Sequence, residues 1–96
     1  MRKIYIVSYD IREPKRLNRT YNKMRGYGNH LQYSVFLCDL SEKERIIMVS
    51  ELMDIINLSE DSVIIFEIGA SENNAGKRIK TIGKALEMKE RNAIII

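Results

Sequence analysis

The strongest structural signal in the sequence is a run of β-branched and aromatic residues near the N-terminus. Residues 4–9 have the sequence IYIVSY, in which apolar side chains occupy both sets of alternating positions, and Asp10 ends the run. This composition is typical of a β-strand, and apolar residues on both faces indicate a central strand. A chain of 96 residues is therefore expected to form one domain, with further strands on either side of this one.

Two segments have the periodicity of amphipathic helices. The first begins at Pro14, a residue suited to the first helical turn, and ends near Gly26 and Gly28. Its apolar positions are Leu17, Tyr21 and Met24. The second begins at Ser41, which forms a capping-box motif with Glu44, and extends to about residue 57. Its predicted buried stripe consists of Ile46, Val49, Leu52, Met53 and Ile56.

The other apolar segments predict further strands. Residues 30–40 alternate between two faces, either as one bent strand or as a short hairpin, and we place Tyr33 and Phe36 in the core. Residues 63–68 form a strand that is apolar on both faces. Residues 69–76 form a polar loop, and residues 79–82 form a short edge strand. Residues 93–96 form a terminal apolar segment that needs a surface to cover.

The order of these segments predicts an α+β fold. Strand, helix, two strands, helix and strand is the order of a ferredoxin-like βαββαβ sandwich, in which two helices cover one face of an antiparallel sheet. We expect a single domain over residues 1–96. So short a chain buries only about 60% of its unfolded surface, and its lone cysteine, Cys38, excludes an internal disulfide. Both facts favour a homodimer.

Charged residues are segregated along the chain. Residues 1–30 hold eight basic and two acidic residues, residues 39–72 hold two basic and nine acidic residues, and residues 77–91 hold six basic and two acidic residues. This pattern suggests one face for a polyanion and another for a basic partner or solvent. The lone cysteine favours a cytoplasmic protein, and no segment reaches the roughly 20 apolar residues of a membrane span.

Two familiar kinds of site are excluded or disfavoured. Six residues separate Gly69 from Gly76, whereas a phosphate-binding loop has four, and Arg78 stands where serine or threonine would hold magnesium. His30 and Cys38 lack the clustered partners of a zinc site. We interpret Cys38 as a small buried hydrophobic residue rather than as a nucleophile.

The candidate site is Asp10, where the first strand meets a loop and a basic helix follows. A carboxylate in this position is well placed to hold a hard cation, with Arg16 and Arg19 binding flanking phosphates. Alternatively, Asp10 accepts backbone N–H bonds in the turn that opens the helix. One carboxylate is few for magnesium, but a twofold dimer would let two copies of Asp10 share one ion.

Several short motifs occur together and in order along the chain. They are Ser8-Tyr9-Asp10-Ile11, Lys15-Arg16-Leu17-Asn18-Arg19, Tyr27-Gly28, Gln32-Tyr33-Ser34-Val35-Phe36, Leu40-Ser41-Glu42 and Asp61-Ser62-Val63. In this combination the chain resembles the Cas-two family of CRISPR-associated proteins, the small companions of the CRISPR integrase. The resemblance covers nearly the whole chain.

The resemblance implies a homodimeric endonuclease of spacer acquisition that depends on magnesium or another divalent cation such as manganese. Its substrate would be single-stranded RNA, double-stranded DNA or both, and its partner the integrase of the Cas-one family. Asp10 would be the metal ligand, and Tyr9, Arg16, Arg19 and Phe36 would complete the catalytic site. Residues 92–96 would form an additional C-terminal strand that pairs with the partner subunit's sheet.

The residues predicted to bind nucleic acid are Lys15, Arg16, Arg19, Lys23 and His30. His30 stands where the family commonly has arginine, and Leu37 stands where a glutamate often occurs, so the site depends more heavily on Asp10. A non-catalytic dimeric scaffold that binds duplex DNA and bridges integrase subunits stays open as an alternative. If the resemblance is accidental, a small-molecule regulatory domain or a toxin-like ribonuclease on the same fold is the third candidate.

Overall fold

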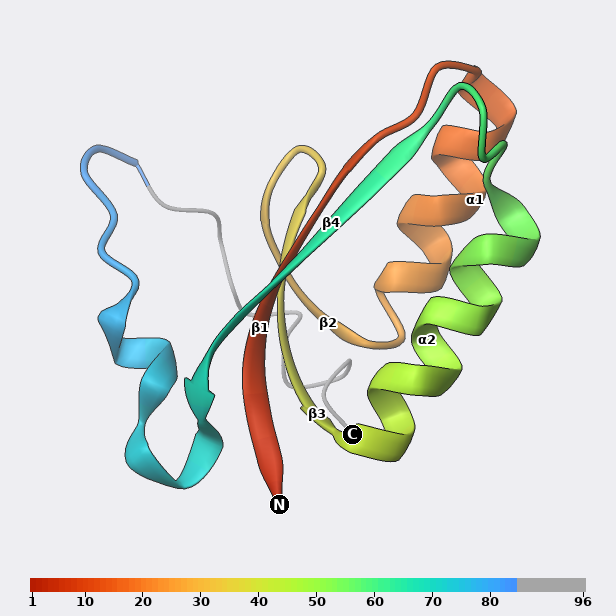
Figure 1. Ribbon diagram of the computed structural model, residues 1–96. Coiled ribbons are helices and arrows are strands. Elements are labelled where there is room, and N and C mark those ends of the chain that lie inside the picture. The colour runs from red at the N-terminus through yellow and green to blue at the C-terminus, as the bar shows by residue number, and fades with distance from the viewer. Residues whose placement is uncertain (85–96) are drawn as a thin grey trace.

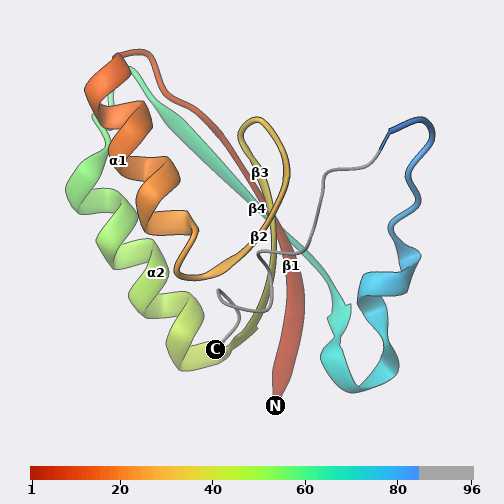
Figure 2. The same cartoon turned by 180° about the vertical axis from the view of Figure 1, so that it is seen from behind.

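The computed structural model describes residues 1–84, which form one four-stranded sheet and two helices. The elements in chain order are β1 (Arg2–Asp10), α1 (Pro14–Met24), β2 (Gly28–Gln32), β3 (Val35–Ser41), α2 (Glu42–Ile55) and β4 (Ser62–Ala70). The strand order is β2-β3-β1-β4, and all neighbouring strands are antiparallel. Both helices lie on the same side of the sheet (Figure 1, Figure 2). The predicted ferredoxin-like arrangement, with β1 in the centre, is confirmed.

The two faces of the sheet have different surroundings. Tyr5, Val7 and Tyr9 of β1 are at most 5% exposed and belong to the hydrophobic core. The other buried members of this core come from β3, the helices and the segment after β1: Phe36, Cys38, Leu40, Met24, Met48, Leu52 and Ile11. Because side chains alternate along a strand, the intervening residues of β1 lie on the opposite face, which neither α1 nor α2 covers.

Residues 28–41 form a hairpin rather than one bent strand. β2 and β3 pair across a turn at Tyr33 and Ser34, with a register irregularity between His30 and Gln32. Phe36 is fully buried, as predicted, but Tyr33 is 94% exposed, so its placement in the core was wrong. Tyr33 lies in the turn and not in a paired strand, so the alternation of side chains along a strand does not direct it into the core.

Helix α2 buries only part of the predicted stripe. Leu52 is buried and Val49 and Ile56 pack against the core, as predicted. Ile46 and Met53 are each 53% exposed, and Met48 and Ile55 are buried instead. Apolar residues occur on all sides of this helix, so the helical period does not select one face. Packing against the sheet determines which face of α2 is buried, and an apolar strip is left on the outer surface of the helix.

The start of α2 has the predicted capping box. The Ser41 hydroxyl accepts a hydrogen bond from the Glu44 backbone N–H at 3.1 Å, and the Glu44 carboxylate accepts one from the Ser41 N–H at 2.8 Å. Those hydrogen bonds satisfy two backbone donors that a helix start leaves unpaired. The bond from the Ser41 N–H also holds the pKa of the Glu44 carboxyl below its usual range.

We expect Ser41→Ala to lower the free energy of unfolding by about 1 kcal/mol, because the hydroxyl acceptor for the Glu44 N–H is lost. Urea denaturation followed by circular dichroism measures this change. Ser50→Ala is the matched control, since Ser50 is exposed in the interior of the same helix and alanine is favourable there. An equal or larger loss in the Ser50 variant would contradict the capping role.

The chain after β4 differs from the prediction. Ser71–Asn73 and Ala75–Arg78 form two short 3-10 helices, joined by Asn74 in the left-handed conformation (φ 56°). Residues 79–82 do not form the predicted edge strand, and Ile82 is 99% exposed. The two helical turns lead the chain away from β4 (Figure 1), so these residues are not aligned with the sheet edge. The predicted strand over residues 92–96 lies outside the described residues.

Candidate active site at the end of strand β1

Asp10 is the last residue of β1 and is held there by the strand ladder. It pairs with Ser62 of β4, and its side chain is 68% exposed. Since Tyr9 points into the core, Asp10 points to the face of the sheet opposite the helices. The Arg12 guanidinium lies 3.6 Å from the Asp10 carboxylate, at an exposed position. The carboxylate is therefore accessible, while its backbone is fixed by pairing.

An aromatic cluster lies behind this strand end, on the helix side of the sheet. Tyr9 and Phe36 stack with ring centroids 6.2 Å apart, and Tyr21 and His30 pack on Phe36 at 5.8 and 5.0 Å. Burial raises the pKa of Tyr9 to about 12, so its hydroxyl stays protonated at neutral pH. Tyr9 and Phe36 are thus placed beneath the strand end and support its geometry from the core.

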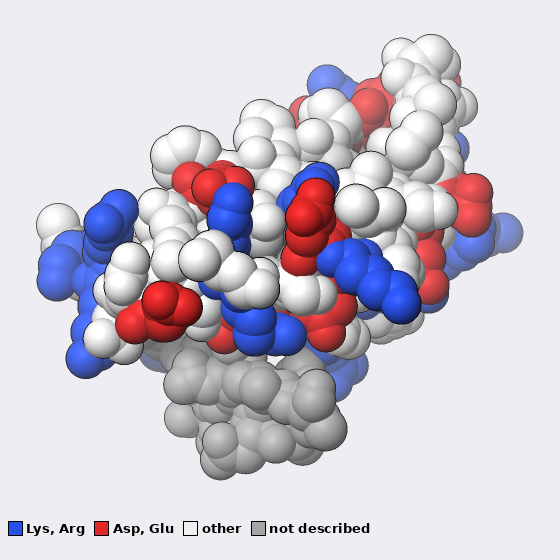
Figure 3. All heavy atoms as spheres, turned by 60° about the horizontal axis from the view of Figure 1, so that its bottom comes forward, with Lys and Arg blue, Asp and Glu red and all other residues white. Residues whose placement is uncertain are grey.

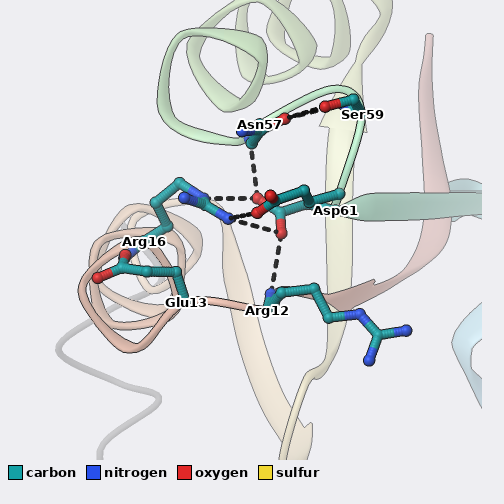
Figure 4. A network of polar contacts seen from close by, with 7 residues as sticks. Arg12, Glu13, Arg16, Asn57, Ser59 and Asp61 are labelled. Carbon is teal, nitrogen blue, oxygen red and sulfur yellow. Dashed lines mark hydrogen bonds and ion pairs between the residues drawn. The ribbon is translucent and has the colours of Figure 1, made fainter.

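A buried carboxylate that the sequence analysis did not single out organises the neighbouring loops. The Asp61 side chain has no exposed surface, and Arg16 donates to it from Nε at 2.7 Å and from Nη2 at 3.2 Å (Figure 4). The backbone N–H groups of Arg12 and Asn57 also donate to it, at 2.9 and 2.8 Å. Chiefly because of the Arg16 hydrogen bond, the pKa of Asp61 lies well below its usual range.

This lowered pKa gives a prediction for acid stability. The pKa of Asp61 is lower in the folded state than the value of about 3.9 expected when unfolded, so the ionised carboxylate stabilises the fold above about pH 4. That contribution is lost as the pH falls toward the folded-state pKa. We expect the thermal midpoint to decrease from about pH 5 downward, and to decrease less steeply in Asp61→Asn. Equal slopes in thermal melts of the two proteins would contradict this assignment.

The basic residues of α1 fall into two groups. Arg16 is only 21% exposed and is also bound by Glu60, whose Oε1 lies 3.0 Å from Nη2. Lys15 and Arg19 are exposed and form no ion pair with the described residues.

Arg19 and Lys23 line a groove of about 860 Å³ between α1 and α2. The groove is also lined by Asn22, Gly26, Tyr27, Glu51, Asp54 and Ile55.

Besides Arg16, two further residues predicted to bind phosphate, Lys23 and His30, are engaged in contacts within the chain. Lys23 lies 3.7 Å from Glu51, which also accepts a hydrogen bond from the Tyr27 hydroxyl. The His30 ring packs edge-on against Tyr21 at 5.2 Å, and its Nε2 lies 2.6 Å from the Tyr33 carbonyl oxygen. A carbonyl oxygen can only accept, so Nε2 carries the proton in this contact. His30 therefore fastens the hairpin turn in this conformation.

The charge blocks of the sequence partly neutralise each other in the fold. The basic residues of the first block pair with the acidic residues of the second in Arg2–Asp39, Arg2–Glu44, Lys3–Glu67, Arg16–Asp61 and Lys23–Glu51. On the surface shown in Figure 3, basic and acidic side chains are interleaved rather than separated. The unpaired basic charge of α1 is therefore a smaller patch than the sequence totals indicate.

Residues 1–84 of a single chain do not form a complete metal site. No group of three or more His, Cys, Asp or Glu side chains converges within that part of the protein. Cys38 is fully buried, and burial raises the pKa of its thiol to about 12, which confirms the prediction of an inert hydrophobic residue. None of the described helices is long and apolar enough to cross a membrane. Asp10 can hold a metal ion only with ligands from outside these residues.

The face of the sheet that carries Asp10 is apolar in its centre. Ile6 pairs with Leu37 of β3 and with Phe66 of β4, and Ser8 pairs with Ile64. The side chains of Ile64 and Phe66 are each 64% exposed. Strands β1, β3 and β4 thus present an apolar surface that we call the open face, consisting of Ile6, Leu37, Ile64 and Phe66. Asp10 lies at its edge, four residues along β1 from Ile6.

Comparisons with known proteins agree with this architecture. A crystal structure of Cas2 from Streptococcus pyogenes matches with a TM-score of 0.74 at 28% identity, covering 83% of this chain and 99% of that chain. CRISPR-associated endoribonuclease Cas2 of Geobacter sulfurreducens is 41% identical over 96 residues, the full length of both chains. CRISPR-associated endoribonuclease Cas2 1 of Rhodospirillum rubrum is 40% identical over 92 residues, 96% of this chain and 89% of the relative.

The family comparison covers the elements that build the site. The model described as CRISPR associated protein Cas2 matches residues 3–78, which include the Asp10 strand end, α1 and the Asp61 network. The resemblance seen in the sequence motifs is therefore confirmed over most of the chain. With full-length relatives at about 40% identity and the same order of strands and helices, the chain belongs to the Cas2 family of CRISPR-associated proteins.

Proposed function

We propose that this protein is a homodimeric, magnesium-dependent endonuclease of CRISPR spacer acquisition that acts in the cytoplasm. Its substrate is single-stranded RNA, double-stranded DNA or both, and manganese is an alternative ion. The observation that carries the proposal is the exposed Asp10 carboxylate at the edge of the open face. The names of the relatives, CRISPR-associated endoribonucleases, support cleavage of RNA in particular.

The open face supports the dimer. A second copy that packs the same surface against Ile64 and Phe66 removes the two most exposed apolar side chains of β4 from water. In such an isologous interface each residue near the twofold axis meets its own copy. With the twofold axis beside Asp10, the two Asp10 carboxylates converge from the two subunits. Residues 92–96 are proposed to extend the contact as a strand on the partner subunit's sheet.

The ligand chemistry of this pair fits magnesium. Magnesium and manganese prefer carboxylate oxygens, and magnesium sites in proteins typically use one or two carboxylates with waters and substrate phosphates. Two Asp10 side chains and a scissile phosphate supply that set. When bound, the ion stabilises negative charge on the phosphate and activates a water molecule. Tyr9 and Phe36 hold the strand end that carries Asp10, from the core side.

The basic residues of α1 supply phosphate contacts away from the metal. Lys15 and Arg19 are the exposed members, and Lys23 joins them once its contact with Glu51 opens. His30 contributes a further hydrogen-bond donor when the β2–β3 turn rearranges. Arg16 belongs to the framework of the site, because its guanidinium is bound to Asp61 and Glu60. These contacts orient the backbone of the nucleic acid relative to Asp10.

A cleavage assay tests the proposed function. Purified protein is incubated with labelled single-stranded RNA and with duplex DNA of the same sequence, in magnesium, in manganese and in EDTA. We expect cleavage of at least one substrate with either metal, none in EDTA, and recovery when magnesium is restored. Undiminished cleavage in EDTA would contradict the metal-dependent mechanism.

A non-catalytic scaffold is the alternative function, favoured by the exposed basic residues of α1. Lys15 and Arg19 bind duplex DNA through its phosphates whether or not Asp10 holds a metal. In this role the dimer bridges subunits of the Cas-one family integrase. Duplex binding together with absence of cleavage of either substrate under all three conditions would favour the scaffold over the nuclease.

A further inference from the structure

Asp61 is a buried carboxylate that lies directly behind the strand end carrying Asp10. We infer that Asp61 is a positioning residue that fixes Asp10 for catalysis, and that Arg16 acts through Asp61 rather than by binding nucleic-acid phosphate. The inference rests on the proposed function, since it concerns how the Asp10 carboxylate is placed in the nuclease. The sequence motif Asp61-Ser62-Val63 did not indicate this role for Asp61.

The hydrogen bonds of Asp61 lie next to the strand end that carries Asp10. Asp10 is the last paired residue of β1, and its partner in β4 is Ser62, the residue after Asp61. Two residues beyond Asp10, the Arg12 N–H donates to Asp61 at 2.9 Å. The segment from Asp10 to Arg12 is thus held at both ends, by the ladder and by the Asp61 carboxylate. Without the second bond, the strand end that carries Asp10 loses one of the contacts that hold it.

Asp61 also joins three separate segments. Its carboxylate accepts from the loop after β1 through Arg12, from the loop after α2 through Asn57, and from α1 through Arg16 (Figure 4). Glu13 fixes the same turn of α1 by accepting from the Arg16 N–H at 2.7 Å. A single side chain therefore sets the placement of α1 and of the β1 end relative to β4.

The guanidinium of Arg16 is already bound by carboxylates within the chain. Two of its nitrogen atoms, Nε and Nη2, are bound by Asp61 and Glu60, and the side chain is 21% exposed. Turning it outward to a phosphate would leave the Asp61 carboxylate, which has no exposed surface, without its counter-charge. Arg19, three residues later on α1, is exposed and has no such partner among the described residues. Phosphate binding is therefore assigned to Arg19.

Salt-dependent RNA binding distinguishes the two roles. Binding of a fluorescein-labelled single-stranded RNA is measured in EDTA over a range of salt concentrations, for wild type, Arg16→Gln and Arg19→Gln. Each lost phosphate contact reduces the magnitude of the slope of log K, the association constant, against log salt concentration by about 0.7. We expect this reduction for Arg19→Gln and an unchanged slope for Arg16→Gln. A reduced slope in Arg16→Gln equal to that of Arg19→Gln would overturn the assignment.

Kinetics test the positioning role itself. We expect Arg16→Gln and Asp61→Asn to lower kcat by about 10- to 100-fold with KM within about twofold of wild type, because the reacting groups are misplaced. The double variant should be no slower than the slower single variant, because both changes remove the same ion pair. Arg16→Lys, which keeps the charge but not the forked geometry, should be intermediate. Multiplicative losses in the double variant would contradict the inference.

Amide hydrogen exchange gives a readout that does not require cleavage. In Asp61→Asn, the Arg12 and Asn57 amides lose their charged acceptor, so both should exchange faster than in wild type. Unchanged protection of the Arg12 amide would refute the role of Asp61. If Asp61→Asn does not fold, the slope and kcat of Arg16→Gln and Arg16→Lys decide the question. If wild type cleaves nothing, the nuclease proposal fails, while exchange and salt slopes still test the Asp61–Arg16 assignment.

Discussion

Asp10→Asn is expected to abolish cleavage of both RNA and duplex DNA in magnesium, with a loss of about 10³-fold or more. Asparagine keeps the size of the side chain and removes its charge, so each subunit loses the ligand that we propose for the metal. Loss of the ion removes several kcal/mol of charge stabilisation from the transition state. Every loss of about 1.4 kcal/mol lowers the rate tenfold. Because Asp10 is 68% exposed, the fold should be unaffected.

Glu42→Gln is the matched control for this prediction. Glu42 is exposed in the first turn of α2, at the other end of the sheet from Asp10, so the same loss of a carboxylate charge there leaves cleavage at the wild-type rate. Equal activity of Asp10→Asn and wild type, in protein freed of contaminating nuclease, would remove Asp10 from the mechanism. Spacer acquisition in cells that carry Asp10→Asn would separate the two candidate functions, because a scaffold needs no catalytic carboxylate.

Phe66→Lys is expected to dissociate the proposed homodimer and to abolish cleavage with it. Phe66 is 64% exposed in the open face, so the substitution is compatible with a folded monomer but places one unpaired charge from each subunit in the interface. A buried unpaired charge costs about 3 kcal/mol or more, which raises the Kd of the dimer by about 100-fold or more. The separated subunits then hold one Asp10 each. Sedimentation and the RNA assay, at matched concentrations, measure both effects.

Met53→Lys controls for the introduction of a lysine. Met53 is 53% exposed on α2, away from the open face, and its substitution should leave both the dimer and cleavage intact. A Phe66→Lys protein that stays dimeric would place the interface elsewhere on the molecule. A monomeric Phe66→Lys protein that cleaves RNA at the wild-type rate would contradict the sharing of one ion between two Asp10 residues.

The sequence predicted the elements well wherever periodicity and local chemistry agreed. β1 was placed in the centre of the sheet because both of its faces are apolar, and Ser41 marked the start of α2 because it forms a capping box. Gly28 was assigned to the end of α1, but its main role is at the start of β2. There an added Cβ would lie 2.6 Å from the Cys38 sulfur. A cross-strand approach of this kind depends on the register of the hairpin, which local patterns do not contain.

The site was predicted less completely than the fold. Asp10 was singled out because a carboxylate where a central strand meets a loop is well placed to hold a cation, and the structure leaves it exposed there. Asp61 was missed because an aspartate followed by serine after a helix is common in turns, and its burial depends on tertiary packing. Arg16 and Arg19 cannot be distinguished by spacing within one basic helix. Their difference comes from the loop before β4, which reaches only Arg16.

The exposed turn between β2 and β3 is a suitable position for a fluorescent probe of the site. The chain has no tryptophan, and the Ser34 carbonyl, next to Tyr33, accepts a hydrogen bond from the Tyr9 amide at 3.1 Å. A Tyr33→Trp protein therefore carries a single indole fluorophore beside the end of β1, at a position that is 94% solvated and free of packing constraints. Its emission can follow the arrival and departure of nucleic acid in real time, in the same sample in which chemistry is quenched by EDTA.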